Sequence, residues 1–257
     1  MTRRSQWLTH PYFVFFLVFF LSEIAALRFS PDFTSPVSLI LQFGVLLGVP
    51  LAACRIIRLP AGLALRLTPA RGRDLGLSVG MGVLLSALLD QITTWQKHLD
   101  LFDTATVESR MVQLIQADSV QQWLWLLAFM VVAPAICEEA LFRGYLLTRL
   151  LEPNGRWRAV LVTSAMFGIF HRSLALLMPA TVGGVFLSLT IVRSRSLYNS
   201  IATHATINLM GVLSANFPKL QPQLSAVSSL AVLFLAGAAS VWMMGFYGRD
   251  NLTGESS

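Results

Sequence analysis

Charged residues are scarce in this chain. Asp, Glu, Lys and Arg make up only 12% of its 257 residues, whereas an ordinary soluble domain carries roughly 25%. Hydrophobic residues make up 55%, and no internal repeat, low-complexity tract or soluble domain interrupts them. This composition excludes a soluble globular protein and indicates an integral membrane protein.

Cysteine is nearly absent as well. The two cysteines, Cys54 and Cys137, fall at or within apolar segments, so no disulfide is expected. The net charge of +6 does not indicate a nucleic-acid partner, because the basic residues stand in short loops between apolar runs. The expected surroundings are a lipid bilayer, and no oligomeric state follows from the sequence.

Long apolar runs recur along the whole chain. A helix needs roughly 20 apolar residues to span a bilayer. The runs cover residues 12–27, 37–54, 75–92, 122–150, 158–172, 174–192, 196–216 and 224–247. They predict an all-α membrane protein: a polytopic bundle of about eight transmembrane helices. We expect one integral-membrane unit over residues 1–247 and a disordered polar tail over residues 248–257.

The basic residues predict the orientation of the bundle. With a cytoplasmic N-terminus, thirteen arginines fall on the inner side and five basic residues on the outer side. Such an excess marks the cytoplasmic side. We therefore expect a multi-pass protein of the plasma (inner) membrane with both termini cytoplasmic. Glu23 interrupts the first run and no A-x-A site closes it, so an uncleaved first helix is expected.

Two local patterns predict details of packing. In the long outer segment 94–122, one helical face collects apolar residues, which predicts an amphipathic helix on the membrane surface, either packed over the bundle or serving as a lid. These residues are Val107, Met111, Leu114 and Ile115. Small residues four apart let helices approach closely. The pairs are Gly44 with Gly48 and Gly76 with Gly80.

The stretch "CEEALFRGYLL", residues 137–147, places ionisable residues within apolar surroundings. Glu138, Glu139 and Arg143 follow about twenty residues of an otherwise apolar run. Ionisable groups at membrane depth are costly and usually functional. These three residues are therefore candidates for a functional site.

Counting inward from the cytoplasmic edge places other polar residues at the same depth. At 1.5 Å per residue, Glu138 lies about 18 Å deep and His171 about 20 Å deep. His204 and Asn208 lie about 14 and 20 Å deep on a third helix. Three helices therefore bring a carboxylate, two imidazoles and a carboxamide into one slab of the membrane.

The helical period assigns different tasks to the two glutamates. Glu139 and Arg143 are four residues apart and share a face, so they can form an ion pair that lowers the cost of burial. Glu138 points about 100° away and is free to face the histidines. His204 and Asn208 are also four apart, so one helix presents both to the same point.

A carboxylate beside two histidines indicates hydrolytic chemistry. Glu138 could activate water as a general base, while an imidazole and a carboxamide donate hydrogen bonds to an oxyanion. Alternatively, Glu138, His171 and His204 could bind zinc, because two His and one Glu form a catalytic ligand set. No H-E-x-x-H motif is present to favour zinc.

The segments "EEALFR", "FGIFH" and "HATIN" resemble the motifs E-E-x-x-x-R, F-x-x-x-H and H-x-x-x-N of the CAAX protease and bacteriocin-processing family. The resemblance covers roughly residues 120–216. It implies an eight-helix bundle with an intramembrane catalytic cavity, in which Glu138 activates water and His171 positions it. It also implies that His204 and Asn208 complete the oxyanion site, that Glu139 and Arg143 support the geometry, and that Phe167 packs beside it.

The resemblance implies a glutamic intramembrane endopeptidase, from a family long described as metal-dependent. No cofactor is expected, with zinc as the alternative. The expected substrate is a membrane-anchored or lipidated protein or peptide, and the arginine-rich composition suits a bacterial source. The alternatives are a non-catalytic scaffold or bacteriocin self-immunity protein, and a proton-coupled transporter, since buried Glu and His also form proton relays.

Overall fold

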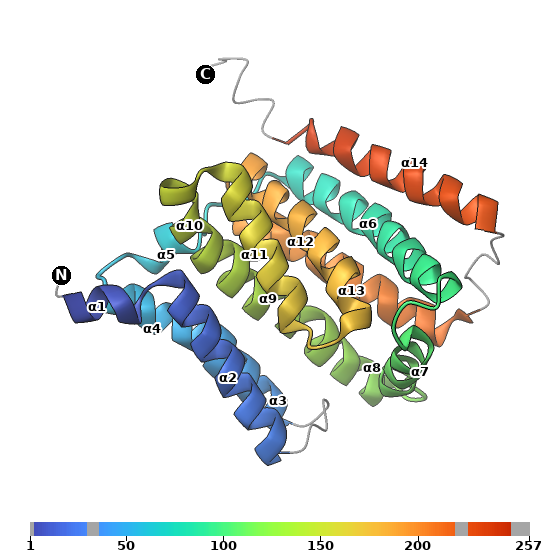
Figure 1. Ribbon diagram of the computed structural model, residues 1–257, viewed down its shortest axis with the longest axis horizontal. Coiled ribbons are helices and arrows are strands. Elements are labelled where there is room, and N and C mark those ends of the chain that lie inside the picture. The colour runs from blue at the N-terminus through green and yellow to red at the C-terminus, as the bar shows by residue number, and fades with distance from the viewer. Residues whose placement is uncertain (1–2, 30–35, 219–225, 248–257) are drawn as a thin grey trace.

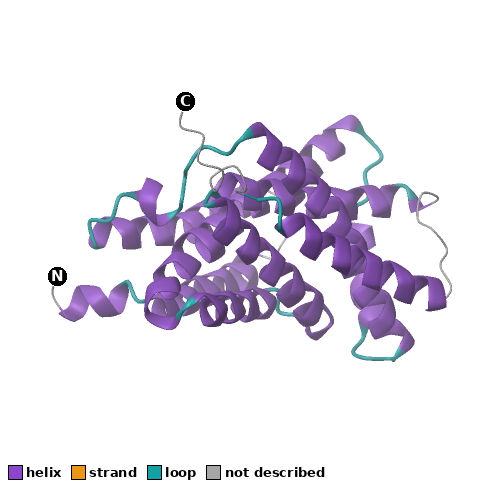
Figure 2. Ribbon diagram, turned by 90° about the horizontal axis from the view of Figure 1, so that it is seen from above, coloured by secondary structure: helices purple, strands orange, loops and turns teal. Residues whose placement is uncertain are grey.

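The structure is a computed structural model that describes residues 3–29, 36–218 and 226–247. Within these ranges every regular element is a helix, as Figure 2 shows. The predicted all-α membrane bundle is confirmed. The predicted polar tail, residues 248–257, lies outside the described residues.

Each of the apolar runs coincides with one long helical segment in the described part of the chain (Figure 1). These segments are α2 (Pro11–Phe29), α3–η1–α4 (Pro36–Leu41, Gln42–Leu47, Gly48–Ile56), α6 (Gly72–His98), α8–η2–α9–η3–α10 (Val120–Leu126, Leu127–Val132, Ala133–Glu139, Ala140–Leu146, Leu147–Asn154), α11 (Arg156–Phe170), α12 (Leu174–Ser194), α13 (Leu197–Asn216) and α14 (Ala226–Met244). Shorter helices are α1 (Arg3–Leu8), α5 (Ala61–Ala64) and α7 (Thr104–Leu114).

Length and composition identify the helices that can cross a membrane. Four of the described helical segments qualify: Val37–Ile56, Gly72–His98, Val120–Leu151 and Leu174–Ser194. The stretches Pro11–Ala25 and Leu230–Met244 are apolar but shorter. Helices α11 and α13 carry polar residues that face the interior.

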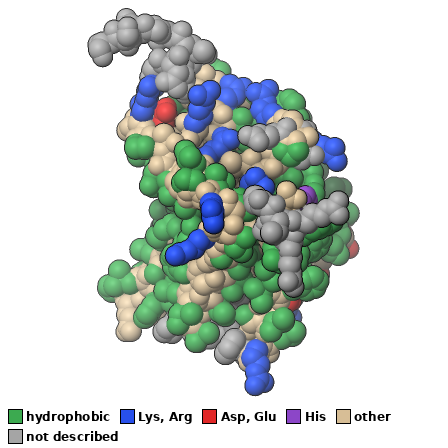
Figure 3. Space-filling view, turned by 90° about the vertical axis from the view of Figure 1, so that its left-hand side faces the viewer, with side chains coloured by type: hydrophobic (Ala, Val, Ile, Leu, Met, Phe, Trp, Pro, Cys, Tyr) green, Lys and Arg blue, Asp and Glu red, His purple; other side chains and the backbone are tan. Residues whose placement is uncertain are grey.

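The pattern of exposed and buried side chains is the reverse of that in a soluble protein. Phe16, Phe20 and Ile24 on α2 are exposed, whereas Glu139 and Arg143 are fully buried. Hydrophobic side chains cover much of the face in Figure 3. Because lipid solvates apolar side chains and leaves polar groups unsatisfied, this is the arrangement that a membrane favours.

The longest helical segment contains two π-helical stretches, and we call it the motif helix (residues 120–154). The first stretch, η2, ends two residues before Pro134. Proline lacks an N–H and its ring pushes against the carbonyl four residues back, which widens the preceding turn. The segment η1 precedes Pro50 in the same way. The second stretch, η3, begins directly after Glu139.

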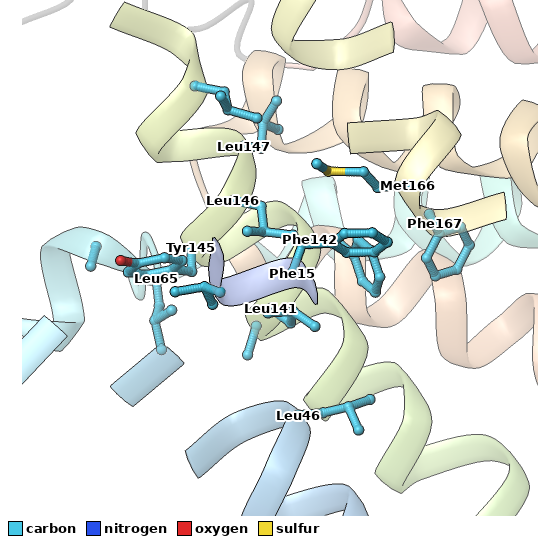
Figure 4. Close-up of a cluster of buried hydrophobic side chains, with 14 of the residues drawn as sticks. Phe15, Leu46, Leu65, Leu141, Phe142, Tyr145, Leu146, Leu147, Met166 and Phe167 are labelled. Atoms are coloured by element: carbon cyan, nitrogen blue, oxygen red, sulfur yellow. The ribbon is translucent and has the colours of Figure 1, made fainter. Parts of the chain in front are cut away.

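Helix α2 packs onto the motif helix through aromatic side chains. Phe142 lies at the centre of the cluster in Figure 4, with its ring centroid 6.3 Å from that of Phe15 on α2 and 5.1 Å from that of Phe167 on α11. All three side chains are buried. The helix that carries the glutamates is therefore held between α2 and α11.

Segment 94–122 contains the predicted helix, α7. Asp103 caps α7, its side chain accepting from the backbone N–H of Thr106. An ion pair between Lys97 and Glu108 ties α7 to the end of α6. Met111 and Leu114 are exposed and Ile115 is buried, so the apolar face only partly packs on the bundle.

Of the expected glycines, Gly80 lies at a close contact between helices, because an added Cβ would lie 3.2 Å from Cε of Met243 on α14. A Cβ added at Gly44 or Gly76 would meet no atom within 4 Å. At Gly82, on α6, an added Cβ would lie 2.5 Å from Cβ of Thr206 and 2.7 Å from the carbonyl oxygen of Thr203. The expectation holds at Gly80 and fails at Gly44 and Gly76, because spacing along one helix does not reveal which face another helix covers.

We predict that Gly82→Ala destabilises the protein and Gly76→Ala does not. The new methyl group at Gly82 forces α6 and α13 apart, and overpacking costs roughly 1–3 kcal/mol. At Gly76 the same change gains helix propensity, up to about 1 kcal/mol. Thermal unfolding of the two purified variants in detergent measures the difference. Equal midpoints would contradict the close α6–α13 contact.

Candidate active site

Three helices bring the predicted site residues together. Glu138 and Glu139 end α9, His171 follows the last residue of α11, and His204 and Asn208 lie on α13. Helix α13 packs against α9 and α12, and α11 packs against α12 and η3. The three motifs thus meet in the interior of the bundle.

Glu139 is fully buried and surrounded by donors. Its Oε1 accepts from Nη1 of Arg143 at 2.8 Å and lies 2.8 Å from Nδ1 of His204. Its Oε2 accepts from Oγ of Ser200 at 2.5 Å. The expected Glu139–Arg143 pair is present, and breaking such a buried pair costs roughly 3–5 kcal/mol.

Arg143 joins the motif helix to two other helices. Its Nη2 donates to the carbonyl oxygen of Gly184 on α12 at 3.3 Å. Its guanidinium carbon lies 4.1 Å from the ring centroid of Phe167 on α11, within the range of a cation–π interaction. The buried guanidinium of Arg143 is therefore both paired with a carboxylate and packed against an aromatic ring.

Glu138 has a different environment from its neighbour. Its side chain is 16% exposed, and Oε2 lies 4.0 Å from Nε2 of His204. It forms no other ion pair with the described residues. The carboxyl group of Glu138 is thus accessible and faces a histidine, as the helical period predicts.

The contacts of His204 define the roles of its two nitrogens. A carboxylate accepts hydrogen bonds and cannot donate them, so Nδ1 carries a proton toward Glu139. Nε2 then remains toward Glu138. Glu139 consequently orients the imidazole in the way that a buried carboxylate orients a catalytic histidine.

His171 occupies the turn that ends α11. Its Nδ1 lies 2.8 Å from the carbonyl oxygen of Phe167, which requires a proton on Nδ1 and leaves Nε2 available. The next residue, Arg172, has φ of 55°, which ends the helix abruptly. Arg172 also forms an ion pair with Glu23, tying this turn to α2.

Phe167 connects the two histidines. Its ring centroid lies 4.8 Å from that of His171 and 5.7 Å from that of His204, both edge to face. The same ring receives the guanidinium of Arg143. The packing role that the resemblance implies for Phe167 thus has a physical basis.

Asn208 lies one helical turn after His204 on α13 and is half-buried. Its carboxamide makes no hydrogen bond within the described part of the chain, which leaves it available to a ligand. The structure also adds two contacts absent from the sequence analysis: the hydroxyl of Ser200 and the close approach at Gly184. Ser200 is four residues before His204, so helical periodicity could have found it.

Zinc binding requires several ligands to converge. In the described ranges, no three His, Cys, Asp or Glu side chains are grouped closely enough to hold a metal ion. One nitrogen of His204 is engaged with Glu139, so only Nε2 could serve as a ligand. The proposed zinc ligands would have to move together.

We predict that Ser200→Ala destabilises the protein whereas Ser188→Ala does not. Removing the Ser200 hydroxyl withdraws a hydrogen bond from a buried carboxylate, at a cost of about 1–3 kcal/mol. Ser188 is equally buried, but its hydroxyl has no hydrogen-bond partner among the described residues. Its removal should be neutral or stabilising. Matched thermal unfolding curves test this, and equal shifts would show that Ser200 does not support Glu139.

The comparison with known families agrees with the site geometry. Residues 120–210 match the family model of the type II CAAX prenyl endopeptidase Rce1-like proteins. No curated protein and no solved structure matches the chain. The matched residues include all three motifs and every residue of the candidate site. The match covers about a third of the chain and supports the resemblance of this segment to the CAAX protease and bacteriocin-processing family.

Proposed function

We propose that this protein is an intramembrane glutamic endopeptidase in which Glu138 activates the hydrolytic water. The observation that carries the proposal is the unequal environment of the two glutamates. Glu139 is fully buried and already accepts hydrogen bonds from Arg143 and Ser200. Glu138 is accessible and lies near Nε2 of His204.

A general base must be able to accept a proton from water. The oxygens of Glu139 are occupied by donors, one of them a guanidinium, so a further proton would displace an existing interaction. Glu138 has no such partner among the described residues, and its side chain is 16% exposed. The division of tasks between adjacent residues therefore favours Glu138 as the base.

The proposed reaction has two steps. Glu138 takes a proton from a water molecule held by His171, and the water oxygen attacks the carbonyl carbon of the peptide bond. The carboxamide of Asn208 donates a hydrogen bond to the resulting oxyanion, and Nε2 of His204 donates a second one when the imidazole carries a proton on each nitrogen. The carbon–nitrogen bond then breaks, and the proton held by Glu138 passes to the departing amine.

The proposal requires no metal ion. Glu139 orients His204 through Nδ1 and leaves Nε2 toward Glu138, an orientation that serves a contact with the substrate or, equally, a zinc ligand. Zinc bound by Glu138, His171 and His204 is the alternative. Stoichiometric zinc in the purified protein, lost in His171→Ala, would favour that alternative.

A site inside the membrane favours a membrane-anchored or lipidated polypeptide as the substrate. Such a chain reaches the interior of the bundle from the bilayer without first leaving it. We place the protein in a bacterial plasma membrane with both termini cytoplasmic, because this orientation leaves most arginines on the inner side.

We predict that Glu138→Gln abolishes proteolysis without unfolding the protein. The amide keeps the shape of the carboxyl group but cannot accept a proton, and loss of a general base costs roughly 10²–10⁴ in rate. The measurement compares peptide termini in membranes and medium of cells that carry either form at equal abundance. Asp90→Asn, a change at an exposed carboxylate on α6, is the matched control.

Termini that vanish with Glu138→Gln and persist with Asp90→Asn would establish proteolysis and identify the substrate. Identical termini in all three cell lines would overturn the proposal. A function that survives Glu138→Gln would then indicate a scaffold or immunity protein, and loss of proton coupling without loss of termini would indicate a transporter.

A further inference from the structure

A cavity lies away from the candidate active site. It has a volume of about 410 Å³ and is lined by Leu63, Arg66, Thr68, Leu151, Val192 and Arg195, together with Gly62. These residues come from α5 and the loop after it, from the end of α10 and from the end of α12, near the labels α5 and α10 in Figure 1. None of them is a candidate catalytic residue.

The backbone holds the two arginines of this cavity near each other. The N–H of Leu197 donates to the carbonyl oxygen of Arg66 at 3.0 Å, and Oγ of Ser196 donates to that of Thr68 at 2.6 Å. These bonds tie the loop after α5 to the turn between α12 and α13. Because these hydrogen bonds involve Arg66 itself and residues next to Arg195, the backbone keeps the two arginines close to each other.

Both arginines adopt a backbone conformation that side chains disfavour. The φ angle is 53° at Arg66 and 60° at Arg195, in the left-handed region where glycine is usual. The fold therefore places two like charges together at positions where an uncharged glycine would be easier to accommodate. An anion bound between the two side chains would compensate their charge.

The compensating charge is not supplied by the described residues. Neither Arg66 nor Arg195 is paired with a carboxylate there, although Arg143, Arg172 and Lys97 all are. Burial and, to a lesser extent, the charge of Arg195 lower the pKa of Arg66. Nε of Arg66 donates to Oγ1 of Thr148 at 3.1 Å, which leaves its other four N–H donors for a partner.

The position of the cavity identifies the kind of anion. The membrane-crossing segments Val120–Leu151 and Leu174–Ser194 both end at it. Its wall combines the two arginines with Leu63, which is 70% exposed, and with Leu151 and Val192. On the face shown in Figure 3, Lys and Arg side chains outnumber Asp and Glu. A ligand with a negative head and an apolar body fits both parts of this wall.

We propose that the cavity binds the phosphate of an anionic phospholipid headgroup. Each guanidinium can donate two parallel hydrogen bonds to phosphate oxygens, and the ligand's acyl chains would lie along the leucine and valine side chains. The inner leaflet supplies such lipids, and basic pockets between membrane helices on that side recognise them. The proposal does not depend on the proteolytic activity.

The test uses the full-length protein in detergent micelles that contain equal amounts of phosphatidylglycerol and phosphatidylcholine with the same acyl chains. Native mass spectrometry measures how many of each lipid the protein retains. We expect Arg66→Gln and Arg195→Gln each to reduce the preference for phosphatidylglycerol about tenfold or more, beyond what the loss of one surface charge would do, because each change removes charge-assisted hydrogen bonds to the phosphate. Arg193→Gln is the matched control, because Arg193 is exposed, lies two residues from Arg195 and does not line the cavity.

Three outcomes would overturn the proposal. One is an unchanged preference in both cavity variants, and another is an equal reduction in Arg193→Gln, which would indicate a general surface charge effect. The third is displacement of phosphatidylglycerol by millimolar inorganic phosphate, which would assign the cavity to free phosphate. Arg195 is exposed, so Arg195→Gln decides the matter even if Arg66→Gln fails to fold.

Discussion

The burial of the Glu139 carboxylate is the constraint on which the rest of the site depends. A charge in the interior of a membrane protein must be compensated by groups that are themselves held in place. Arg143 supplies the charge, and its second nitrogen reaches α12 at Gly184. Ser200 contributes from α13 and also contacts the carbonyl oxygen of Leu187 on α12. One carboxylate thus joins the motif helix, α12 and α13 into a rigid unit.

Because of this constraint, the structural task and the proposed chemical task fall to two adjacent residues, Glu139 and Glu138. If a single glutamate served both tasks, the interactions that stabilise its charge would also prevent it from taking a proton from water. Consecutive residues of a helix point in different directions, so Glu139 can hold the bundle together while Glu138 stays accessible. His204 links the two, with one nitrogen on Glu139 and the other toward Glu138. A substitution at Glu139 should therefore disturb the orientation of His204 as well as stability.

Much of this arrangement could be predicted because a bilayer permits few solutions. Apolar runs must form helices, and the helical period then determines that Glu139 faces Arg143 while Glu138 does not. What could not be predicted depends on contacts between distant segments. The helical period places Ser200 on the same face as His204, but it does not reveal that the hydroxyl of Ser200 bonds to Glu139, 61 positions away. Gly76 and Gly82 look alike in the sequence and differ only in whether α13 lies opposite.

The N-terminal half lies outside the segment that matches the family, yet it contacts the motif helix where the backbone widens. The hydroxyl of Tyr145 donates to the carbonyl oxygen of Thr9 at 2.7 Å, and Leu65 fills the space beside Gly144. The loop that carries Leu65 also carries Arg66, whose side chain bonds to Thr148 on the same helix. A headgroup bound at Arg66 would therefore stabilise the loop that packs on the turn following Glu139. Lipid binding and the geometry of the site would then be coupled through one helix, without direct contact between lipid and catalytic residues.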